Sequence, residues 1–166
     1  MGGQESKTNN MTHQDFMQRA IELAQRGMDS GAGGPFGAVV VKDNQIIAEG
    51  WNKVTSTNDP TAHAEVTAIR LACEKLGSFQ LEGCVIYTSC EPCPMCLGAI
   101  YWARPEKVFY GCDRHDAADI AFDDQFIYDE IDAPIHNRQI PFEQLGSEAA
   151  IAVFQAWAAK ADKTEY

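Results

Sequence analysis

The sequence predicts an α/β fold, in which a mixed β-sheet carries a layer of helices on each face. Residues 84–111 read as strand, helix and strand, and a crossover of that length joins parallel strands. A hairpin pattern in residues 38–49 adds antiparallel pairing, and amphipathic segments near both ends of the chain supply further helices. Ligands of such sheets bind at strand ends, near helix N-termini, so a functional site is expected there.

The first elements are a helix and a hairpin. Apolar side chains recur at helical spacing from Thr12 to about Gly27. The glycine-rich loop at 31–35 lacks the spacing of a phosphate-binding loop, so it reads as a turn that lets backbone approach the site. Two short strands, 38–41 and 46–49, flank a turn and form the hairpin.

The later elements begin with a helix that has Thr61 as its expected N-cap and Gly77 at its end. Pro94 suits the first position of another helix, which makes Cys93 the N-cap of that helix. The remaining elements are a strand at 84–89, the helix at 94–103, a strand at 107–111 and a last helix at 147–160.

The residues that carry chemistry lie at the starts of these two helices. His63 belongs to the first, and Cys93 and Cys96 to the second. An imidazole and two thiolates suit zinc, and three protein ligands leave a fourth position for water or hydroxide. A helix N-terminus also stabilises negative charge, which helps to keep the thiols deprotonated. The sequence therefore predicts one zinc ion per site, bound by His63, Cys93 and Cys96.

Glu65 stands two residues after His63 and is a poor candidate for a fourth ligand. A carboxylate beside zinc-bound water is better interpreted as a proton carrier. His-x-Glu followed by Pro-Cys-x-x-Cys is the known signature of zinc-dependent nucleobase deaminases. We therefore predict that Glu65 is catalytic.

Composition limits the choice of substrate and compartment. The 166 residues carry a net charge of −11, and the acids gather most densely in residues 113–132. Nucleic-acid binding depends on lysine and arginine, so a polynucleotide substrate is disfavoured. No apolar run reaches membrane length, and the clustered cysteines suit reduced thiols in the cytoplasm. We expect a disordered leader at 1–11 and one domain at 12–166.

Several longer segments resemble bacterial guanine deaminases of the zinc-dependent cytidine/deoxycytidylate deaminase superfamily. The resemblance runs from about residue 12 to the end of the chain. Its first half is shared with tRNA adenosine deaminases and cytosine deaminases, whereas Phe-Asp-Asp at 122–124 and the terminal Tyr166 are more discriminating. The matching segments are 33–38, 58–70, 87–105, 122–128, 154–157 and Tyr166.

The resemblance implies a three-layer cytidine-deaminase-like fold with a mixed five-stranded sheet. It also implies zinc-dependent hydrolysis of guanine to xanthine and ammonia, with zinc on the three ligands named above. Such proteins are homodimers that exchange their C-terminal segments. In a swapped dimer, Glu65 of one chain is expected to work with Asp124 and Tyr166 of the other.

The resemblance further implies roles for residues outside the metal motif. Asn52 is expected to hydrogen-bond the purine, and Tyr166 to close the pocket. Asp124 is expected to be a second acid near the leaving amine. We also assign Phe36 and Trp102, which lie in matched segments, to substrate binding. From spacing alone, Asp124 would be one more acid in an acidic run.

Other interpretations stay open. The same chemistry suits guanosine, cytosine or another aminated ring, and less well a tRNA adenosine. A Cys-x-x-Cys pair alone is also typical of redox sites and structural zinc sites. A closed structural site would take Cys90 or Cys73 as its fourth ligand and leave Glu65 without a role. The chain would then be a zinc-stapled interaction module and not an enzyme.

Overall fold

The computed structural model describes residues 10–166. It divides into two compact units, the first ending at Asp124 and the second running from Gln125 to Tyr166. The sequence predicts a disordered leader at 1–11 and a single domain from residue 12 onward. Residues 1–9 of that leader lie outside the described part. None of the helices in the described part combines the length and apolar character needed to cross a bilayer.

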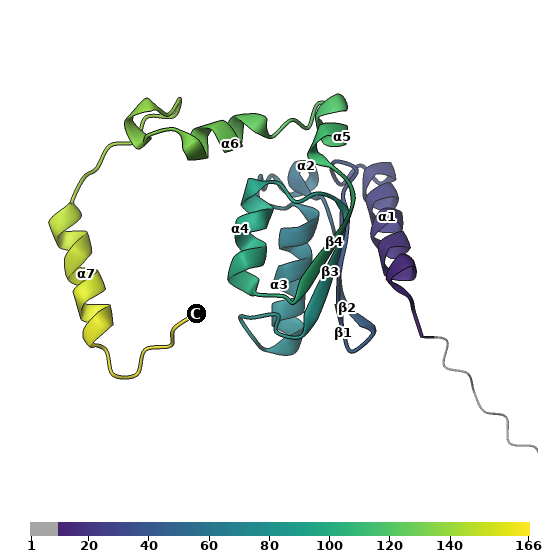
Figure 1. The fold of residues 1–166 in the computed structure, drawn as a ribbon, viewed down its shortest axis with the longest axis horizontal. Coiled ribbons are helices and arrows are strands. Elements are labelled where there is room, and N and C mark those ends of the chain that lie inside the picture. Colours follow the sequence, from purple (N-terminus) through teal and green to yellow (C-terminus); the bar gives the residue numbers. More distant parts are fainter. Residues whose placement is uncertain (1–9) are drawn as a thin grey trace, which may run out of the picture. The chain divides into compact units, whose positions relative to one another are not determined.

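The first unit is built on a mixed sheet with the strand order β2-β1-β3-β4 (Figure 1). The central strand β1 pairs antiparallel with both of its neighbours, and β3 pairs parallel with β4. The predicted hairpin and parallel crossover are thus confirmed. The strands are β1 (Gly37–Lys42), β2 (Gln45–Trp51), β3 (Cys84–Cys90) and β4 (Lys107–Cys112).

The expected five-stranded sheet is wrong for the described residues, whose sheet has four strands. Directly after β4 the chain enters the short helix α5 (Arg114–Asp119). Asp113 caps this helix by accepting from the backbone N–H of Asp116, whose carboxylate accepts in turn from the N–H of Asp113. This capping box stabilises the start of α5, and the elements that follow it in the described residues are helical.

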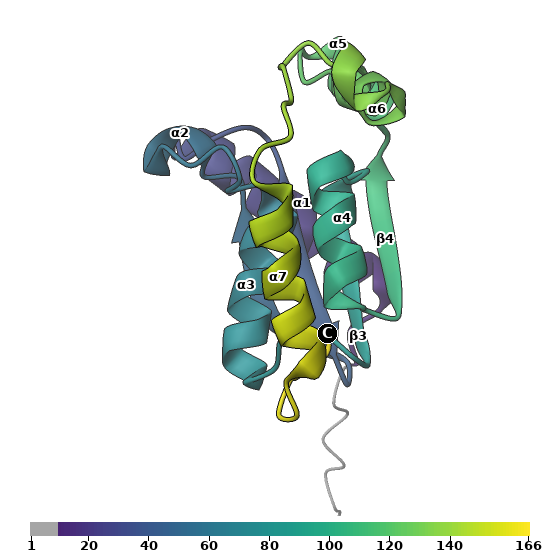
Figure 2. The same ribbon diagram turned by 90° about the vertical axis from the view of Figure 1, so that its left-hand side faces the viewer.

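Helices cover both faces of the sheet, as predicted. The side chains of β1 alternate, so Val39 and Val41 pack with Leu23 of α1 (His13–Asp29) on one face. Val40 packs on the other face with α3 (Ala64–Leu76) and α4 (Pro94–Ala103). These two helices contact each other along that face (Figure 2). The first unit is therefore a three-layer α/β/α structure.

The start of α3 is pressed against the sheet. A Cβ atom on Gly50 of β2 would lie 2.4 Å from the carbonyl oxygen of Ala64, which no side chain can accommodate. Glycine at this point lets the first turn of α3 approach the strand directly. The backbone on which Glu65 stands is thereby held against a rigid sheet.

The N-cap of α3 is His63, so the prediction of Thr61 is wrong. The Thr61 hydroxyl donates to Asp59 in the preceding turn and accepts from the Arg70 side chain of α3 at 3.5 Å, so it does not cap that helix. Gly77, in the left-handed region at φ 61°, ends the helix as predicted. In α4 the predicted cap Cys93 and first residue Pro94 are both confirmed.

A short helix, α2 (Val54–Thr57), follows β2 and completes the first unit. The second unit contains α6 (Gln125–Asp132), a 3-10 turn (Ile135–Asn137) and α7 (Ser147–Ala159). The position of α7 confirms the helix predicted at 147–160. The described chain exposes large apolar side chains of α7, namely Ile151, Val153, Phe154 and Trp157.

Candidate active site

The functional side chains meet where α3 and α4 begin. His63 and Cys93 are the N-caps of these helices, and both have extended backbone. Neither side chain caps its own helix, so each is free to face the other. His63 Nδ1 lies 3.5 Å from Cys93 Sγ and 3.6 Å from Cys96 Sγ.

These three residues suit a zinc ion. Their ligand atoms all lie within 4.8 Å of one another. Zn–S bonds of about 2.3 Å and Zn–N bonds of about 2.0–2.1 Å in a tetrahedron separate nitrogen from sulfur by about 3.6 Å. The two distances from His63 match that separation. An imidazole with two thiols is also the donor set that favours zinc over calcium or magnesium.

The two thiols differ in their readiness to ionise. A hydrogen bond from Cys96 lowers the pKa of Cys93 to about 4, whereas the same bond and burial raise the pKa of Cys96. The Cys93 thiolate in turn raises the pKa of His63. Cys93 is therefore the thiol that ionises more readily, and zinc binding to both sulfurs requires Cys96 to lose its proton as well.

Glu65 lies beside the cluster and is buried. Its Oε1 accepts a hydrogen bond from the Thr88 hydroxyl at 2.8 Å, and its Oε2 lies 3.3 Å from Cys96 Sγ. Burial raises the pKa of the Glu65 carboxyl. A carboxyl group with a raised pKa, next to three metal-binding side chains, is suited to taking up and returning a proton.

Asn52 is buried just after β2, and its orientation is fixed. Its Oδ1 accepts from the backbone N–H groups of Gly34 and Val54, at 3.3 Å and 3.1 Å. A Cβ atom on Gly33 would lie 2.2 Å from that oxygen, so the loop needs glycine there. Because both bonds use the amide oxygen, the amide NH₂ group remains to donate.

Phe36 is joined by an aromatic residue to which the sequence assigned no role. The rings of Phe36 and Phe122 meet edge to face, with centroids 5.0 Å apart. A Cβ atom on Gly34 would lie 2.9 Å from the Phe122 ring. Phe122 thus ties the segment after α5 to the glycine loop. The only signal in the sequence was its place in the Phe-Asp-Asp segment.

Asp124 lies in the same unit of the chain as Glu65 and Cys93. Burial raises the pKa of Asp124, and the negative charge of Cys93 raises it further. Asp124 therefore interacts electrostatically with the cluster of its own chain. The expectation that a partner chain supplies Asp124 stays a prediction.

Trp102 lies away from the metal cluster along α4. Trp102 is 63% exposed and stands near the C-terminal end of α4, six residues beyond Cys96. That separation is about 9 Å along the helix axis. Tyr166 ends the second unit, outside the unit that holds the cluster. Cys73 and Cys90, the alternative fourth ligands, are not part of the cluster of metal-binding groups found in the described residues.

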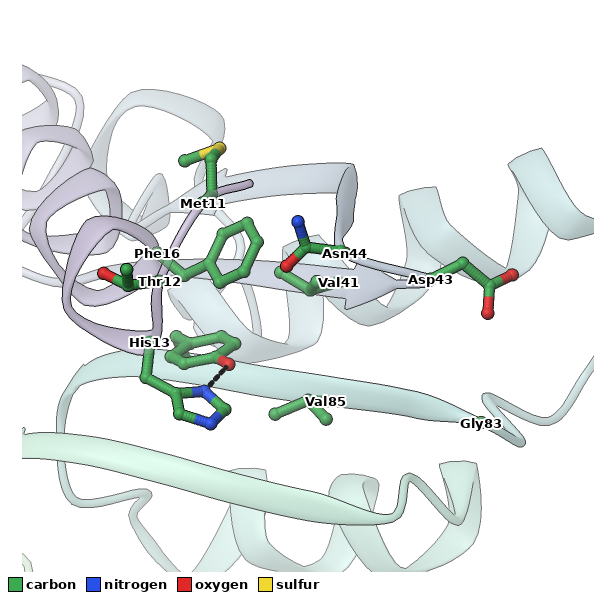
Figure 3. A pocket seen from close by; sticks show the side chains of 10 residues that line it. Met11, Thr12, His13, Phe16, Val41, Asp43, Asn44, Gly83 and Val85 are labelled. Atoms are coloured by element: carbon green, nitrogen blue, oxygen red, sulfur yellow. Dashed lines mark hydrogen bonds between the residues drawn. The ribbon is translucent and has the colours of Figure 1, made fainter. Parts of the chain in front are cut away.

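A separate pocket of about 330 Å³ lies at the opposite end of β3 (Figure 3). The N-terminus of α1, the β1–β2 turn and the start of β3 line it. Within it, His13 Nδ1 lies 2.6 Å from the Tyr87 hydroxyl. None of the predicted site residues is in its lining, so it is distinct from the metal cluster.

Residues 10–112 match the family model described as the cytidine and deoxycytidylate deaminase zinc-binding region. The chain belongs to this deaminase family. The matched residues include the complete metal cluster and Glu65, so the family's zinc cofactor agrees with the donor set found in the structure.

Two similar proteins of the deaminase family are named for different substrates. The chain is 61% identical to the guanine deaminase of Bacillus subtilis (strain 168) over 156 residues, which are 94% of this chain and 100% of that protein. It is 35% identical to the tRNA-specific adenosine deaminase of Aquifex aeolicus (strain VF5), over 81% of this chain and 86% of that protein.

Solved structures of the deaminase family show the same fold. An X-ray structure of guanine deaminase from Bacillus subtilis superposes with a TM-score of 0.91 at 61% identity, covering 94% of this chain and 99% of that one. A guanine deaminase structure from Nitrosomonas europaea gives a TM-score of 0.65 at 32% identity, over 68% and 65% of the two chains. The α/β cytidine-deaminase-like fold is thereby confirmed.

Proposed function

We propose that this protein is a zinc-dependent guanine deaminase, which hydrolyses guanine to xanthine and ammonia. The observation that carries the chemistry is the cluster of His63, Cys93 and Cys96 with the buried, non-ligating Glu65 beside it. The assignment of guanine is supported by the 61% identical relative of that name, which the chain matches along its whole length. A closed structural zinc site would give Glu65 no role, so this alternative has less support than the catalytic site.

His63, Cys93 and Cys96 would hold the ion. When bound, zinc supplies a water molecule whose pKa is lowered to near neutrality. Glu65 takes a proton on Oε2, the oxygen nearer the ligands, and returns it to a ring nitrogen of the purine. Burial favours the protonated carboxyl, which lets Glu65 hold that proton between the two transfers.

Four further residues complete the proposed site. The Asn52 NH₂ group donates to an acceptor on the purine, and the Phe36 ring contacts its face. Asp124 carries a proton more readily than an exposed aspartate and assists departure of the amine as ammonia. We propose that Tyr166 closes the pocket, as the resemblance implies, and the assignment of Trp102 to substrate binding stays a prediction.

The test of this function is a deamination panel of guanine, guanosine, cytosine, cytidine and adenine, with ammonia release as the readout. We expect fast turnover of guanine and much slower turnover of either nucleoside. The net charge of −11 predicts that RNA and DNA do not compete. Preferred deamination of guanosine or of a tRNA adenosine would overturn the substrate, and no ammonia from any substrate would overturn the enzyme.

We further propose that the protein works in the cytoplasm as a homodimer that exchanges its second unit. The support is the run of exposed apolar side chains on α7, which needs a surface to cover, and exchange of an identical element is a low-cost route to a dimer. All six cysteines are free, which suits a reducing compartment.

Mixing two inactive variants tests the exchange. Because Asp124 belongs to the first unit, the second lesion has to be placed at Tyr166, paired with Glu65→Ala in the other chain. In a swapped heterodimer one site carries both lesions and the other neither, so activity returns. Verified heterodimers without recovered activity would mean that a single chain completes each site.

A further inference from the structure

Thr88 is a buried hydroxyl on the strand that leads to the metal cluster. It is 1% exposed, near the end of β3, and its Oγ1 donates to Glu65 Oε1 at 2.8 Å. The same oxygen lies 3.1 Å from the carbonyl oxygen of Cys90. The Thr88–Glu65 contact joins residues 23 apart in the chain and brings β3 to the first turn of α3.

Apolar packing alone does not account for a hydroxyl at this position. Side chains two apart on a strand share a face, and Ile86 on the face of Thr88 packs into the apolar core with Ala38 and Val40. A valine would fill nearly the same volume and leave no polar group to satisfy. The distinctive contact of Thr88 is its bond to Glu65.

We propose that Thr88 is a positioning residue, which fixes the Glu65 carboxylate so that Oε2 faces the metal ligands. This inference rests on the proposed function. A glutamate has three side-chain torsions, and the last of them, about the bond to the carboxylate, is only weakly restricted. The bond from Thr88 holds Oε1, which sets the plane of the carboxylate and leaves Oε2 3.3 Å from Cys96 Sγ.

The anchor is rigid. Thr88 lies opposite Ala38 of β1 and Tyr110 of β4, so its backbone is paired on both sides. Its branched Cβ also restricts rotation about χ1. Functional groups are held best by side chains on such paired elements, and small displacements of a catalytic group cost large factors in rate.

The second acceptor makes the anchor reversible. A hydroxyl has one proton and donates to one acceptor at a time. If Glu65 turns toward substrate, the Thr88 hydroxyl can donate to the Cys90 carbonyl and is not left unsatisfied. Thr88 therefore holds Glu65 in place without a large penalty for its movement.

The test compares Thr88→Val, which keeps the shape, with Thr88→Ser, which keeps the hydroxyl. We expect Thr88→Val to lower kcat by about 10–100-fold, the usual cost of losing a supporting hydrogen bond at a metal site. KM, zinc content and the affinity for xanthine should stay within about twofold, because Thr88 touches neither purine nor metal. Thr88→Ser should restore most of the rate.

A double mutant separates positioning from a structural role. In a Glu65→Gln background there is no proton carrier to position, so adding Thr88→Val should change kcat by less than about twofold. A structural role would instead lower the rate by the same factor in both backgrounds. That result, or a Thr88→Val enzyme as fast as the wild type, would overturn the inference.

The failures of the inference and of the proposed function look different. If the wild-type chain deaminates a ring other than guanine, only the substrate assignment is wrong. The Thr88 variants can then be compared with that ring as the substrate. A wild-type chain without deaminase activity overturns both. If Thr88→Val does not fold with zinc, Thr88→Ala takes the same test. Failure of both variants to fold with zinc would show a structural role and overturn the inference.

Discussion

Glu65 Oε2 lies 3.3 Å from Cys96 Sγ, although the two residues are 31 positions apart in the chain. The close approach results from the packing of α3 beside α4, with Gly50 letting the first turn of α3 reach the sheet. Glu65 and the ligand His63 therefore belong to the start of α3, whereas the two thiol ligands belong to the start of α4. Two kinds of variant should accordingly fail in different ways.

Removing a ligand should remove the metal. We expect Cys93→Ala to lower zinc affinity by more than about 100-fold. Substitution of residues that only hydrogen-bond a metal ligand already lowers metal affinity by about 10–100-fold. Cys112→Ala is the matched control, since Cys112 is exposed and outside the cluster. Elemental analysis after dialysis against a weak chelator gives the zinc content. Full zinc occupancy in Cys93→Ala would remove that residue from the ligand set.

A methyl group in the glycine loop should disturb Asn52. In Gly33→Ala the new carbon would lie 2.2 Å from Asn52 Oδ1, so the loop must move and the amide must turn. We expect a lower kcat/KM for guanine and a loss of about 1–3 kcal/mol in unfolding free energy. Gly98→Ala in α4 meets no atom within 4 Å and should gain about 0.5–1 kcal/mol. Equal behaviour of the two variants would contradict the assigned role of the loop.

The ion pair between Arg19 and Glu49 should give a small stability change that depends on pH. Both oxygens of Glu49 accept from Arg19, at 2.7 and 2.8 Å, and this pairing lowers the pKa of Glu49. The contribution is therefore complete above the ordinary glutamate pKa and is lost as pH falls through the lower folded value. Because the pair is partly exposed, it should be worth at most about 1 kcal/mol.

Thermal unfolding of wild type and Glu49→Gln at several pH values measures that change. The wild type should have the higher Tm at pH 7, and the difference should shrink as the pH falls below the ordinary glutamate pKa and through the lowered pKa of folded Glu49. A difference that grows on acidification would contradict the lowered pKa.

The parts of the site that the sequence predicted are local. His63, Glu65, Cys93 and Cys96 stand in two short segments, and Pro94 marks a helix start in the second. Strand alternation and loop lengths likewise determined the order of elements in the first unit. Such features depend on neighbours in the chain, which a single sequence displays.

The parts that it missed depend on contacts between distant segments or on competing local bonds. The Thr88–Glu65 bond and the Phe36–Phe122 contact appear only when the sheet and loops are assembled. The expected fifth strand is wrong, because the described chain after β4 forms only helical elements. Trp102 sits in a matching segment, yet the rise along α4 carries it away from Cys96.

The central claim is that Glu65 moves the proton and does not hold the metal. Its most direct test is the rate of guanine deamination by Glu65→Gln, measured together with zinc content on the same sample. Glutamine keeps an oxygen that can accept from Thr88 but cannot carry the proton. The account predicts full zinc occupancy with turnover reduced by about 10²–10⁴-fold. Near-normal turnover, or loss of the zinc, would contradict it.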